Sequence, residues 1–524
     1  MKRCATCIVI TLVALFISLL TTGQVLRVAT GTDAVSLDPH DAAAGPSQNV
    51  YVNIYETLTY IAPDGTIEPC LATSWEQVSD TVTRFYLREG VTFHDGTPFT
   101  ASAVKFTIDR ALDPEDPARI AGAVSAIEDV RVIDNYTVEI TTSEPTPLVP
   151  LMAAHLISIG IVSPSAVETY GDDFGYHPVG TGPFSFVQWD INERIVLKRF
   201  DEYWGEPAGV ETVIYNIIPD SQARKLAMQK GDVDMLLDPE PADLIVYEAS
   251  DDFSVVGGLG LRTMFLVFDC GAGVTSDQLV RRAIAYAIDA ELLAAATLEG
   301  TGVPAKSHIP EGYFGYSDTG VDKTYAYDLE MSRELLREAG WENRDSDKYL
   351  ENESGEELQL ALYGTDGRYP MDRATMITVD YMLRQAGFAT SLLIEPWSTY
   401  IASLFKGERE TFDVAIIGYA TLPDASQFLE QLFAMSNIPP DICCNFGAYV
   451  NAHVSDLLAQ ASSNLDPDDR LSLYAEVLGV LAEELPSYPY AVLRDFVVLA
   501  ANVKGYSLHP LDFYKGDLHG ITME

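Results

Sequence analysis

The sequence has little positive charge: 33 lysine and arginine residues stand against 77 aspartate and glutamate residues, giving a formal net charge of −44. Such a charge repels nucleic acid and anionic lipid, and no basic patch relieves it, so we exclude a nucleic-acid partner. The acidic residues are scattered rather than grouped in runs, which is typical of a solvated surface. Adaptation to a saline environment, where salt screens self-repulsion, is a second interpretation that the sequence leaves open.

Long apolar runs are missing except near the N-terminus. Two basic residues precede an apolar run at 8–20, and small residues follow at 21–23. The run is shorter than the roughly 20 residues that span a bilayer, so a signal peptide over 1–23 is predicted, with a membrane anchor as the alternative. We therefore expect an exported protein, periplasmic or at the cell surface. No cysteine follows Gly23, so no lipid anchor is indicated.

Cysteine is scarce as well. Two of the six cysteines lie in the predicted signal peptide, which leaves Cys70, Cys270, Cys443 and Cys444. In an oxidising compartment these predict one or two disulfides, whose connectivity the sequence leaves open. The adjacent Cys443 and Cys444 are expected to pair with different partners, because a vicinal disulfide strains the backbone. No histidine lies near them in sequence, so we predict no metal site and no cofactor.

Catalytic motifs are also absent. The chain contains no GxSxG, no HExxH and no phosphate-binding glycine loop, and the glycine-rich stretch at 257–260 lacks dinucleotide-binding spacing. A secreted hydrolase is therefore only a distant alternative. No repeat of 20 to 50 residues is visible, which argues against solenoids and propellers.

The pattern that is present indicates mixed α and β structure. Apolar residues alternate over 358–362, a helical spacing follows over 376–386, and Gly387 ends that helix. Apolar stretches at 392–394 and 412–417 read as further strands. Strand, helix and strand at this spacing predict βαβ units and a parallel sheet.

Two further segments have distinct local signals. Asp328 is placed to cap a second helix that Gly340 closes. Residues 81–100 are rich in β-branched and aromatic residues with turns at 88–90 and 94–96, which predicts a meander leading into a helix from Ala101. About 500 residues in the mature chain exceed one core, so two or three domains are expected.

Several motifs together resemble a known family. LATSWE (71–76), followed by FYLREGVTFHDGTPFTASAVKFTIDRAL (85–112), strongly resembles the family 5 solute-binding proteins, the peptide and nickel binders of ABC importers. Further matches follow in the family's order: SLDPH (36–40), NIYETL (53–58), HPVGTGPF (177–184), YWG (203–205), VRRAIAYAID (280–289), LLREAGW (335–341), GRYPMD (367–372), a segment at Trp397, a phenylalanine–aspartate pair at 412–413 and PDASQFL (423–429). Taken singly, many of them are turn or core chemistry, and we expect Trp75, Trp204 and Trp341 to be core anchors. They indicate a fold, and the function must be argued from the site.

The resemblance implies an α/β, two-lobed periplasmic-binding-protein fold of type II, the large class with an extra domain, with mixed sheets flanked by helices. It places the first lobe at 24–45, 178–270 and 488–524, the extra domain at 46–177 and the second lobe at 271–487. Ligand would bind between the lobes and be enclosed by hinge closure.

The same resemblance implies a monomeric binding protein that captures a short peptide and delivers it to an ABC permease. An oligosaccharide or another non-peptide solute is the alternative, although few tryptophans remain for sugar stacking. Nickel is less expected because no histidine cluster is present.

Recognition of the peptide ends is expected to differ from that in relatives. Peptide-binding relatives pair an aspartate with the peptide amino terminus, and that position falls here on Thr421 or Leu422, with Tyr419 in place of a tryptophan. Basic residues that hold the peptide carboxylate in some relatives fall on Leu404 and Ile416. The resemblance therefore leaves both modes of end recognition in doubt.

Arg368 with Tyr369, in a loop between strand and helix, are the remaining candidates for a bidentate contact to a carboxylate. A surface salt bridge is the alternative for Arg368. Trp397 matches a pocket-lining tryptophan of relatives, with core packing as the alternative. Loops at the carboxyl ends of strands are where open α/β sheets place ligands, which favours Arg368 and Tyr419.

Further candidates come from both lobes. Asp33 matches an acidic residue at the pocket edge of some peptide binders and could partly replace the missing aspartate. Met264 and Phe265 are expected to form an apolar wall. Asp424 could reach the pocket only if its loop is rebuilt, and its alternative is a loop or helix N-cap role.

Overall fold

The computed structural model describes residues 24–42, 44–113, 124–154, 159–297, 300–345, 348–369, 371–440, 444–511 and 514–524. The predicted signal peptide at 1–23 and Cys443 lie outside the described residues. None of the helices in the described ranges is long and apolar enough to cross a membrane.

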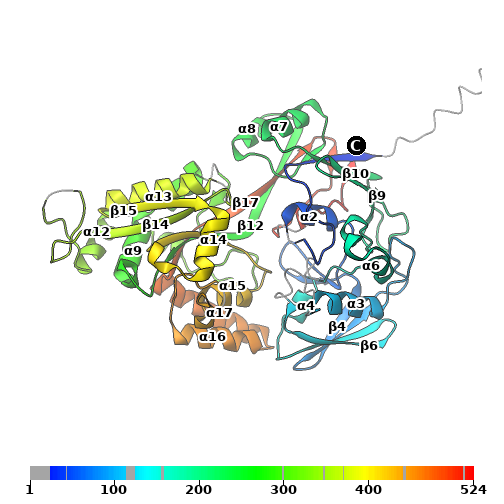
Figure 1. Cartoon of the computed structure of the whole chain (residues 1–524), viewed down its shortest axis with the longest axis horizontal. Coiled ribbons are helices and arrows are strands. Elements are labelled where there is room, and N and C mark those ends of the chain that lie inside the picture. Colours follow the sequence, from blue (N-terminus) through cyan, green and yellow to red (C-terminus); the bar gives the residue numbers. More distant parts are fainter. Residues whose placement is uncertain are drawn as a thin grey trace, which may run out of the picture.

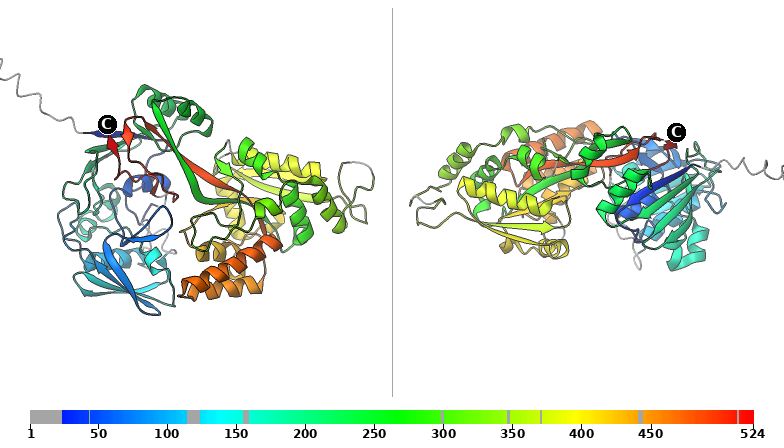
Figure 2. Two further views of the ribbon diagram at one scale, coloured as in Figure 1. Left: turned by 180° about the vertical axis from the view of Figure 1, so that it is seen from behind. Right: turned by 90° about the horizontal axis from the view of Figure 1, so that it is seen from above.

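A single mixed sheet runs through the described part of the chain. Its eleven strands follow the order β15 (Ala389–Pro396), β14 (Gln359–Asp366), β16 (Val414–Tyr419), β12 (Phe253–Phe268), β17 (Ser487–Ala500), β11 (Met235–Leu236), β1 (Val25–Thr30), β10 (Thr212–Ile217), β9 (Arg194–Arg199) and β8 (Phe184–Asp190), with β13 (Gly302–Val303) beside β17. Figures 1 and 2 show two lobes, with β12 and β17 running from one into the other. We call the part with β1 and β8–β11 lobe 1 and the part with β14–β16 lobe 2.

The two connecting strands pair antiparallel along most of their length, from Phe253 opposite Ala500 to Val267 opposite Ser487. Their register shifts between Leu259 and Thr263 and again between Met264 and Phe265. Because this pair of strands carries the sheet from one lobe to the other in the described part of the chain, bending at the irregular stretch would move the lobes as units.

Lobe 2 contains the predicted βαβ unit. The strand β14, the helix α13 (Asp372–Ala386) and the strand β15 follow one another, and the two strands pair in parallel. Gly387 takes a left-handed conformation, and its N–H bonds to the last turn of α13, as predicted. Asp328 caps α12 (Leu329–Glu338) by accepting hydrogen bonds from the N–H groups of Glu330 and Met331, which confirms the second predicted helix.

The meander prediction for 81–100 is only partly right. One strand forms there, β5 (Val82–Leu87), in a four-stranded sheet with β4 (Ala72–Ser79), β7 (Thr137–Thr142) and β6 (Ile127–Asp134). The remainder consists of two turns, at Gly90 and Gly96, because both glycines hold positive φ and end the strand geometry. The predicted helix follows as α3 (Ala101–Ala111). This sheet and α3 enclose a core of their own between Leu58 and Ile161.

The remaining helices and strands cover the sheet faces and the lobe surfaces. They are α2 (Gly45–Tyr51), β2 (Thr59–Ile61), β3 (Ile67–Pro69), α4 (Val149–Met152), α6 (Pro164–Tyr170), α7 (Ser221–Lys230), α8 (Leu244–Glu248), α9 (Gln278–Ala287), α10 (Ala290–Leu292), α11 (Val321–Thr324), α14 (Trp397–Lys406), α15 (Ala425–Phe433), α16 (Ala452–Ser463), α17 (Pro467–Glu484), β18 (Val503–Lys504) and β19 (Thr522–Met523).

Three of the family-like motifs meet at one buried carboxylate, Glu56. It accepts hydrogen bonds from the Thr181 hydroxyl (2.8 Å), the Tyr203 hydroxyl (2.8 Å) and the Trp204 indole N–H (2.8 Å). Burial raises the pKa of the Glu56 carboxyl, and the three donors oppose that rise. Arg88 also lies over the Trp204 ring. Trp204 is therefore a structural anchor, as expected.

A disulfide is present, which agrees with the predicted number of one or two. Cys444 is disulfide-bonded, whereas Cys70 and Cys270 are free thiols, so neither is its partner. Burial raises the pKa of both thiols, which makes them weak nucleophiles. The expectation that Cys443 and Cys444 have different partners falls on Cys443, outside the described residues.

Three histidines are held neutral inside the fold, which predicts acid sensitivity. His94, His308 and His509 each donate Nε2–H to a backbone carbonyl, and burial lowers their pKa to about 4. Their unfolded pKa is about 6.5, so unfolding takes up protons below that pH and stability falls. We expect each histidine to remove about 1.4 kcal/mol of unfolding free energy per pH unit between pH 6.5 and 4.

Urea unfolding at pH 7 and pH 5.5 measures this loss. Replacing His308 with phenylalanine, which can stack with the neighbouring Phe265 ring, should reduce proton uptake on unfolding by one proton. Equal stability of the native protein at the two pH values would contradict the prediction.

Candidate functional site

The carboxyl ends of two parallel strands of lobe 2 lie side by side. The strands β14 and β16 pair in parallel, so the residues that follow β14 (367–369) and the end of β16 at Tyr419 share one edge of the sheet. This is the edge at which open α/β sheets bind ligands. The sequence-predicted residues Arg368, Tyr369 and Tyr419 lie there.

Asp372 fixes the loop that carries Arg368. Its carboxylate is buried and accepts hydrogen bonds from the backbone N–H groups of Gly367 (3.3 Å), Arg368 (2.9 Å) and Tyr369 (3.1 Å). Three backbone donors on one carboxylate hold the loop in a single conformation. Arg368 therefore projects from a rigid support rather than from a mobile loop.

Two aromatic rings stand beside this loop. Tyr369 is buried, its hydroxyl donates to the Gly418 carbonyl (3.1 Å), and its ring meets Trp397 edge to face with centroids 5.8 Å apart. Trp397 is half-buried at the first residue of α14. A Cβ atom at Gly418 would lie 2.6 Å from the Met264 sulfur and 2.7 Å from the Tyr369 ring, so this close packing requires glycine.

Two arginines reach the same place from different elements. The exposed Arg368 guanidinium lies 5.3 Å from the centre of the Tyr369 ring and 5.5 Å from that of Trp397. Arg262, on β12, donates from Nη1 to the Gly418 carbonyl (3.3 Å). Burial raises the pKa of the Tyr369 hydroxyl, and the charges of both arginines act in the opposite direction. In a strongly acidic protein, this pair makes a local positive site suited to carboxylates.

Arg262 was missed by the sequence analysis. It could have been found because it is the single basic residue in the apolar strand around Met264. A charged side chain in a buried strand is costly unless it has a partner or a function. Met264 and Phe265 themselves point to opposite sides, as neighbouring residues of a strand do. Met264 packs under the site at Gly418, whereas Phe265 contacts Phe428 and His308 in the core.

The prediction that Phe265 lines the ligand pocket is therefore corrected to a core role. Its side chain is fully buried between the sheet and α15, on the face of β12 away from Arg262 and Tyr369.

Tyr419 and Thr421 belong to a locked turn after β16. The Tyr419 hydroxyl donates to the side-chain oxygen of Gln431, and its ring packs on Phe428. The Thr421 N–H donates to the Tyr313 hydroxyl (2.8 Å), which in turn donates to the Thr421 carbonyl (3.0 Å). Both residues lie near the site, but these bonds already use the Tyr419 hydroxyl and the Thr421 backbone.

Asp424 has the N-cap role that was its alternative. Its carboxylate caps α15 through the Ser426 N–H (2.9 Å) and forms a 2.6 Å ion pair with Arg470. Both side chains are buried, with exposed fractions of 5% for Asp424 and 6% for Arg470. The Arg470 guanidinium also lies over the Phe314 ring, 4.6 Å from its centre. Asp424 is thus bound into the interior of lobe 2 rather than presented to a ligand.

Asp33 is likewise occupied within lobe 1. It accepts hydrogen bonds from the Trp189 indole N–H (3.1 Å) and from the backbone N–H groups of Asn192 (2.6 Å) and Ala34 (2.8 Å). These contacts tie the segment after β1 to the turn between β8 and β9. They leave Asp33 poorly placed to replace the missing acid.

The site lies on the side of lobe 2 that faces lobe 1. Figure 1 shows α14, which begins at Trp397, on that side. The two parts also approach one another at Gly65 and Gly312, where a Cβ atom on Gly65 would lie 2.7 Å from the Gly312 carbonyl oxygen. A hollow of about 360 Å³ between α15, α16 and the segment 143–148 separates them further out.

The structure thus gathers Arg262, Met264, Arg368, Tyr369 and Trp397 at one place, with Tyr419 beside them. Within the described ranges, no group of three histidine, cysteine, aspartate or glutamate side chains is arranged to hold a metal ion. The arrangement offers guanidinium groups beside aromatic rings, which is chemistry suited to anionic or zwitterionic organic ligands.

Comparisons with known proteins show the family and the fold of this chain. The model of the family described as bacterial extracellular solute-binding proteins, family 5 Middle, matches residues 66–439. The glutathione-binding protein GsiB of Shigella dysenteriae is 28% identical over 489 residues, covering 92% of both chains. The periplasmic binding protein DppA from Helicobacter pylori, in complex with the peptide STSA, is 27% identical with a TM-score of 0.75, covering 96% of this chain and 98% of that one. NikA from Brucella suis, in complex with Fe(III)-EDTA, has a TM-score of 0.83 at 24% identity, over 95% of this chain and 100% of its own, and shows the shared fold.

Proposed function

Because this chain belongs to the bacterial extracellular solute-binding proteins of family 5, we propose that its ligand is a short peptide held mainly through its carboxylates. The chain is a substrate-binding protein of an ABC importer: family members bind a peptide or another small ligand between two lobes and deliver it to the permease. The two lobes and their two-stranded connection are the parts that such a carrier closes around its ligand.

The observation that supports a carboxylate-directed site is the convergence of Arg262 and Arg368 beside Tyr369 and Trp397. The opposite end of a peptide lacks an evident partner, because Asp33 and Asp424 are both engaged elsewhere. The similar protein GsiB is named as a glutathione-binding protein. Glutathione carries two carboxylates and one ammonium group. It therefore matches two guanidinium groups better than a peptide with a single carboxylate, and we propose it as the first ligand to test.

A sugar ligand is less well supported. Trp204 donates to Glu56 and Trp189 donates to Asp33, so both are structural. Trp75 packs on Phe85 in the four-stranded sheet, and Trp341 is packed against the core of lobe 2. Trp397 is the tryptophan of the proposed site, and stacking on sugars usually uses aromatic platforms of more than one ring.

The same proposal includes export of the protein and release of its ligand without chemical change. We propose that residues 1–23 direct export and are removed, so that the mature chain begins near Gln24. The Gln24 side chain is tied to the Met523 carbonyl (2.7 Å), which anchors this end in lobe 1. We further propose that the bound peptide is carried and released unchanged.

End-blocked peptides test the proposed mode of recognition. For one tripeptide and for glutathione, amidation of the carboxyl groups should weaken binding on the order of 100-fold, because each lost charge-assisted contact costs about 1.5–3 kcal/mol. Acetylation of the amino group should cost less than about tenfold, since Asp33 and Asp424, the two acids considered for it, are engaged within the fold. Isothermal titration measures both, and mass spectrometry of the recovered ligand checks that it is intact.

Two outcomes would count against the proposal. A larger loss of affinity on acetylation than on amidation would show that the amino end is recognised. Binding of oligosaccharides but of no peptide would show that the ligand is a sugar.

A further inference from the structure

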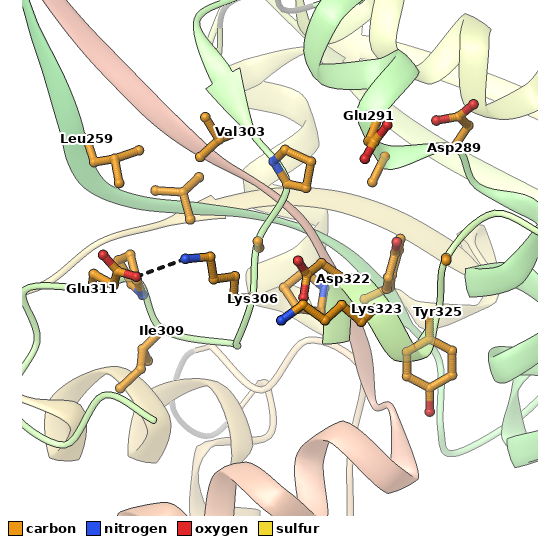
Figure 3. A pocket seen from close by; sticks show the side chains of 18 of the residues that line it. Leu259, Asp289, Glu291, Val303, Lys306, Ile309, Glu311, Asp322, Lys323 and Tyr325 are labelled. Atoms are coloured by element: carbon orange, nitrogen blue, oxygen red, sulfur yellow. Dashed lines mark hydrogen bonds and ion pairs between the residues drawn. The ribbon is translucent and has the colours of Figure 1, made fainter. Parts of the chain in front are cut away.

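A second, larger pocket lies beside the connecting strands. Its volume is about 950 Å³, and its wall is formed by β12, β13 and β17 together with the segment from Asp289 to Tyr327 (Figure 3). None of the described residues that line it is Arg262, Arg368, Tyr369 or Trp397. The pocket is therefore separate from the proposed peptide site.

The floor of this pocket is aromatic and aliphatic. Tyr325 and Tyr488 are almost fully buried, and their rings meet edge to face with centroids 6.4 Å apart. The Tyr325 hydroxyl is already used, because it donates to the Ala482 carbonyl (2.9 Å). Leu259 and Val303 close one end, as Figure 3 shows. Such a floor accommodates the apolar body of a small organic molecule.

The polar groups around this floor are mostly acidic. Four carboxylates line the pocket, against two lysines, and one of those lysines, Lys306, is paired with Glu311 at 3.1 Å. The carboxylates belong to Asp289, Glu291, Glu311 and Asp322. The lining therefore carries net negative charge and favours a cation.

Asp322 is one of several described residues with a buried polar atom that has no hydrogen-bond partner. Its Oδ1 is buried and has no hydrogen-bond partner among the described residues, although Asp322 lines the pocket. The charges of Asp322 and Asp289 both raise the pKa of the Tyr488 hydroxyl beyond the effect of burial, which places them near the aromatic floor.

We propose that this pocket binds a small organic cation with an apolar body, its ammonium group among the carboxylates of the lining, Asp322 included, and its apolar part against Leu259 and Val303. Aromatic rings and carboxylates together are the chemistry that recognises such cations. The proposal does not depend on the identity of the peptide ligand, because none of the residues named for the peptide site lines this pocket.

Three compounds of matched size test it in the full-length mature protein: phenethylammonium, the neutral phenethyl alcohol and the anionic phenylacetate. In isothermal titration, phenethylammonium should bind at least tenfold more tightly than the other two. Asp322→Asn should remove most of this preference. Asp318→Asn, which deletes the same charge at a nearby exposed residue outside the pocket lining, should leave it within about twofold.

The separation of the two sites is checked in the same experiment. Phenethylammonium binding should be unchanged in Arg368→Ala and in the presence of saturating peptide. Equal binding of the three compounds, or loss of the cation's binding in Arg368→Ala, would overturn the proposal. If Asp322→Asn does not fold, the comparison of the three compounds on the native protein still decides it.

Discussion

Replacing Arg368 with alanine is expected to weaken peptide binding on the order of 100-fold, corresponding to about 2–3 kcal/mol, without lowering the melting temperature. The guanidinium is exposed and lies over the Tyr369 and Trp397 rings, so its removal should cost the fold little. Its backbone stays fixed by Asp372, which is why the effect should come from the lost contact rather than from a disordered loop. Isothermal titration with glutathione or a free tripeptide measures it.

Arg262→Ala should have a similar effect on affinity, and the double variant should lose less than the two single losses combined. Two arginines that hold one ligand are coupled, so their effects are not additive. Arg373→Ala is the matched control, because Arg373 carries the same charge on the same segment but pairs with Asp366 at 2.8 Å. If Arg373→Ala weakened binding as much as Arg368→Ala, only the net charge would matter, and the carboxylate site would have to be abandoned.

The local elements could be predicted because their signals lie within a few residues. Asp328 caps a helix whose N–H groups are two and three residues away, and Gly387 ends α13 by taking a left-handed conformation that few other residues adopt. The family motifs fixed the two-lobed fold. Their physical role is packing, since NIYETL, HPVGTGPF and YWG all supply partners around the buried Glu56.

The site was only partly predictable because its decisive contacts join distant parts of the chain. Asp33 is bound to Trp189, 156 residues away, and no local pattern announces that bond. Phe265 and Met264 are both apolar neighbours, and only the sheet decides which one faces Gly418. Arg262 is 156 residues from Gly418, whose carbonyl it contacts, so its place at the site appears only in three dimensions.

Asp424 has two possible roles that experiment can separate: a structural N-cap and ion-pair partner, or the acid that binds the peptide amino group. Asp424→Asn is expected to lower the free energy of unfolding by about 3–5 kcal/mol, because Arg470 would keep a buried charge without its partner. Asparagine still caps α15, so the loss should come from the ion pair and not from the cap. Asp466→Asn is the control: Asp466 is an exposed N-cap whose carboxylate accepts from the N–H groups of Asp468 and Asp469, and its replacement should cost less than about 1 kcal/mol.

Binding by the same variant then decides the role of the acid. At a temperature where Asp424→Asn is folded, its dissociation constants for the free and the amino-acetylated tripeptide should both match those of the native protein within about twofold. An acid that clamped the ammonium group would show the reverse pattern: affinity for the free peptide would fall, affinity for the acetylated peptide would not, and stability would change little. The 2.6 Å ion pair to Arg470 and the burial of both side chains argue for the first pattern, because a carboxylate committed to an interior guanidinium cannot also serve a ligand that enters and leaves.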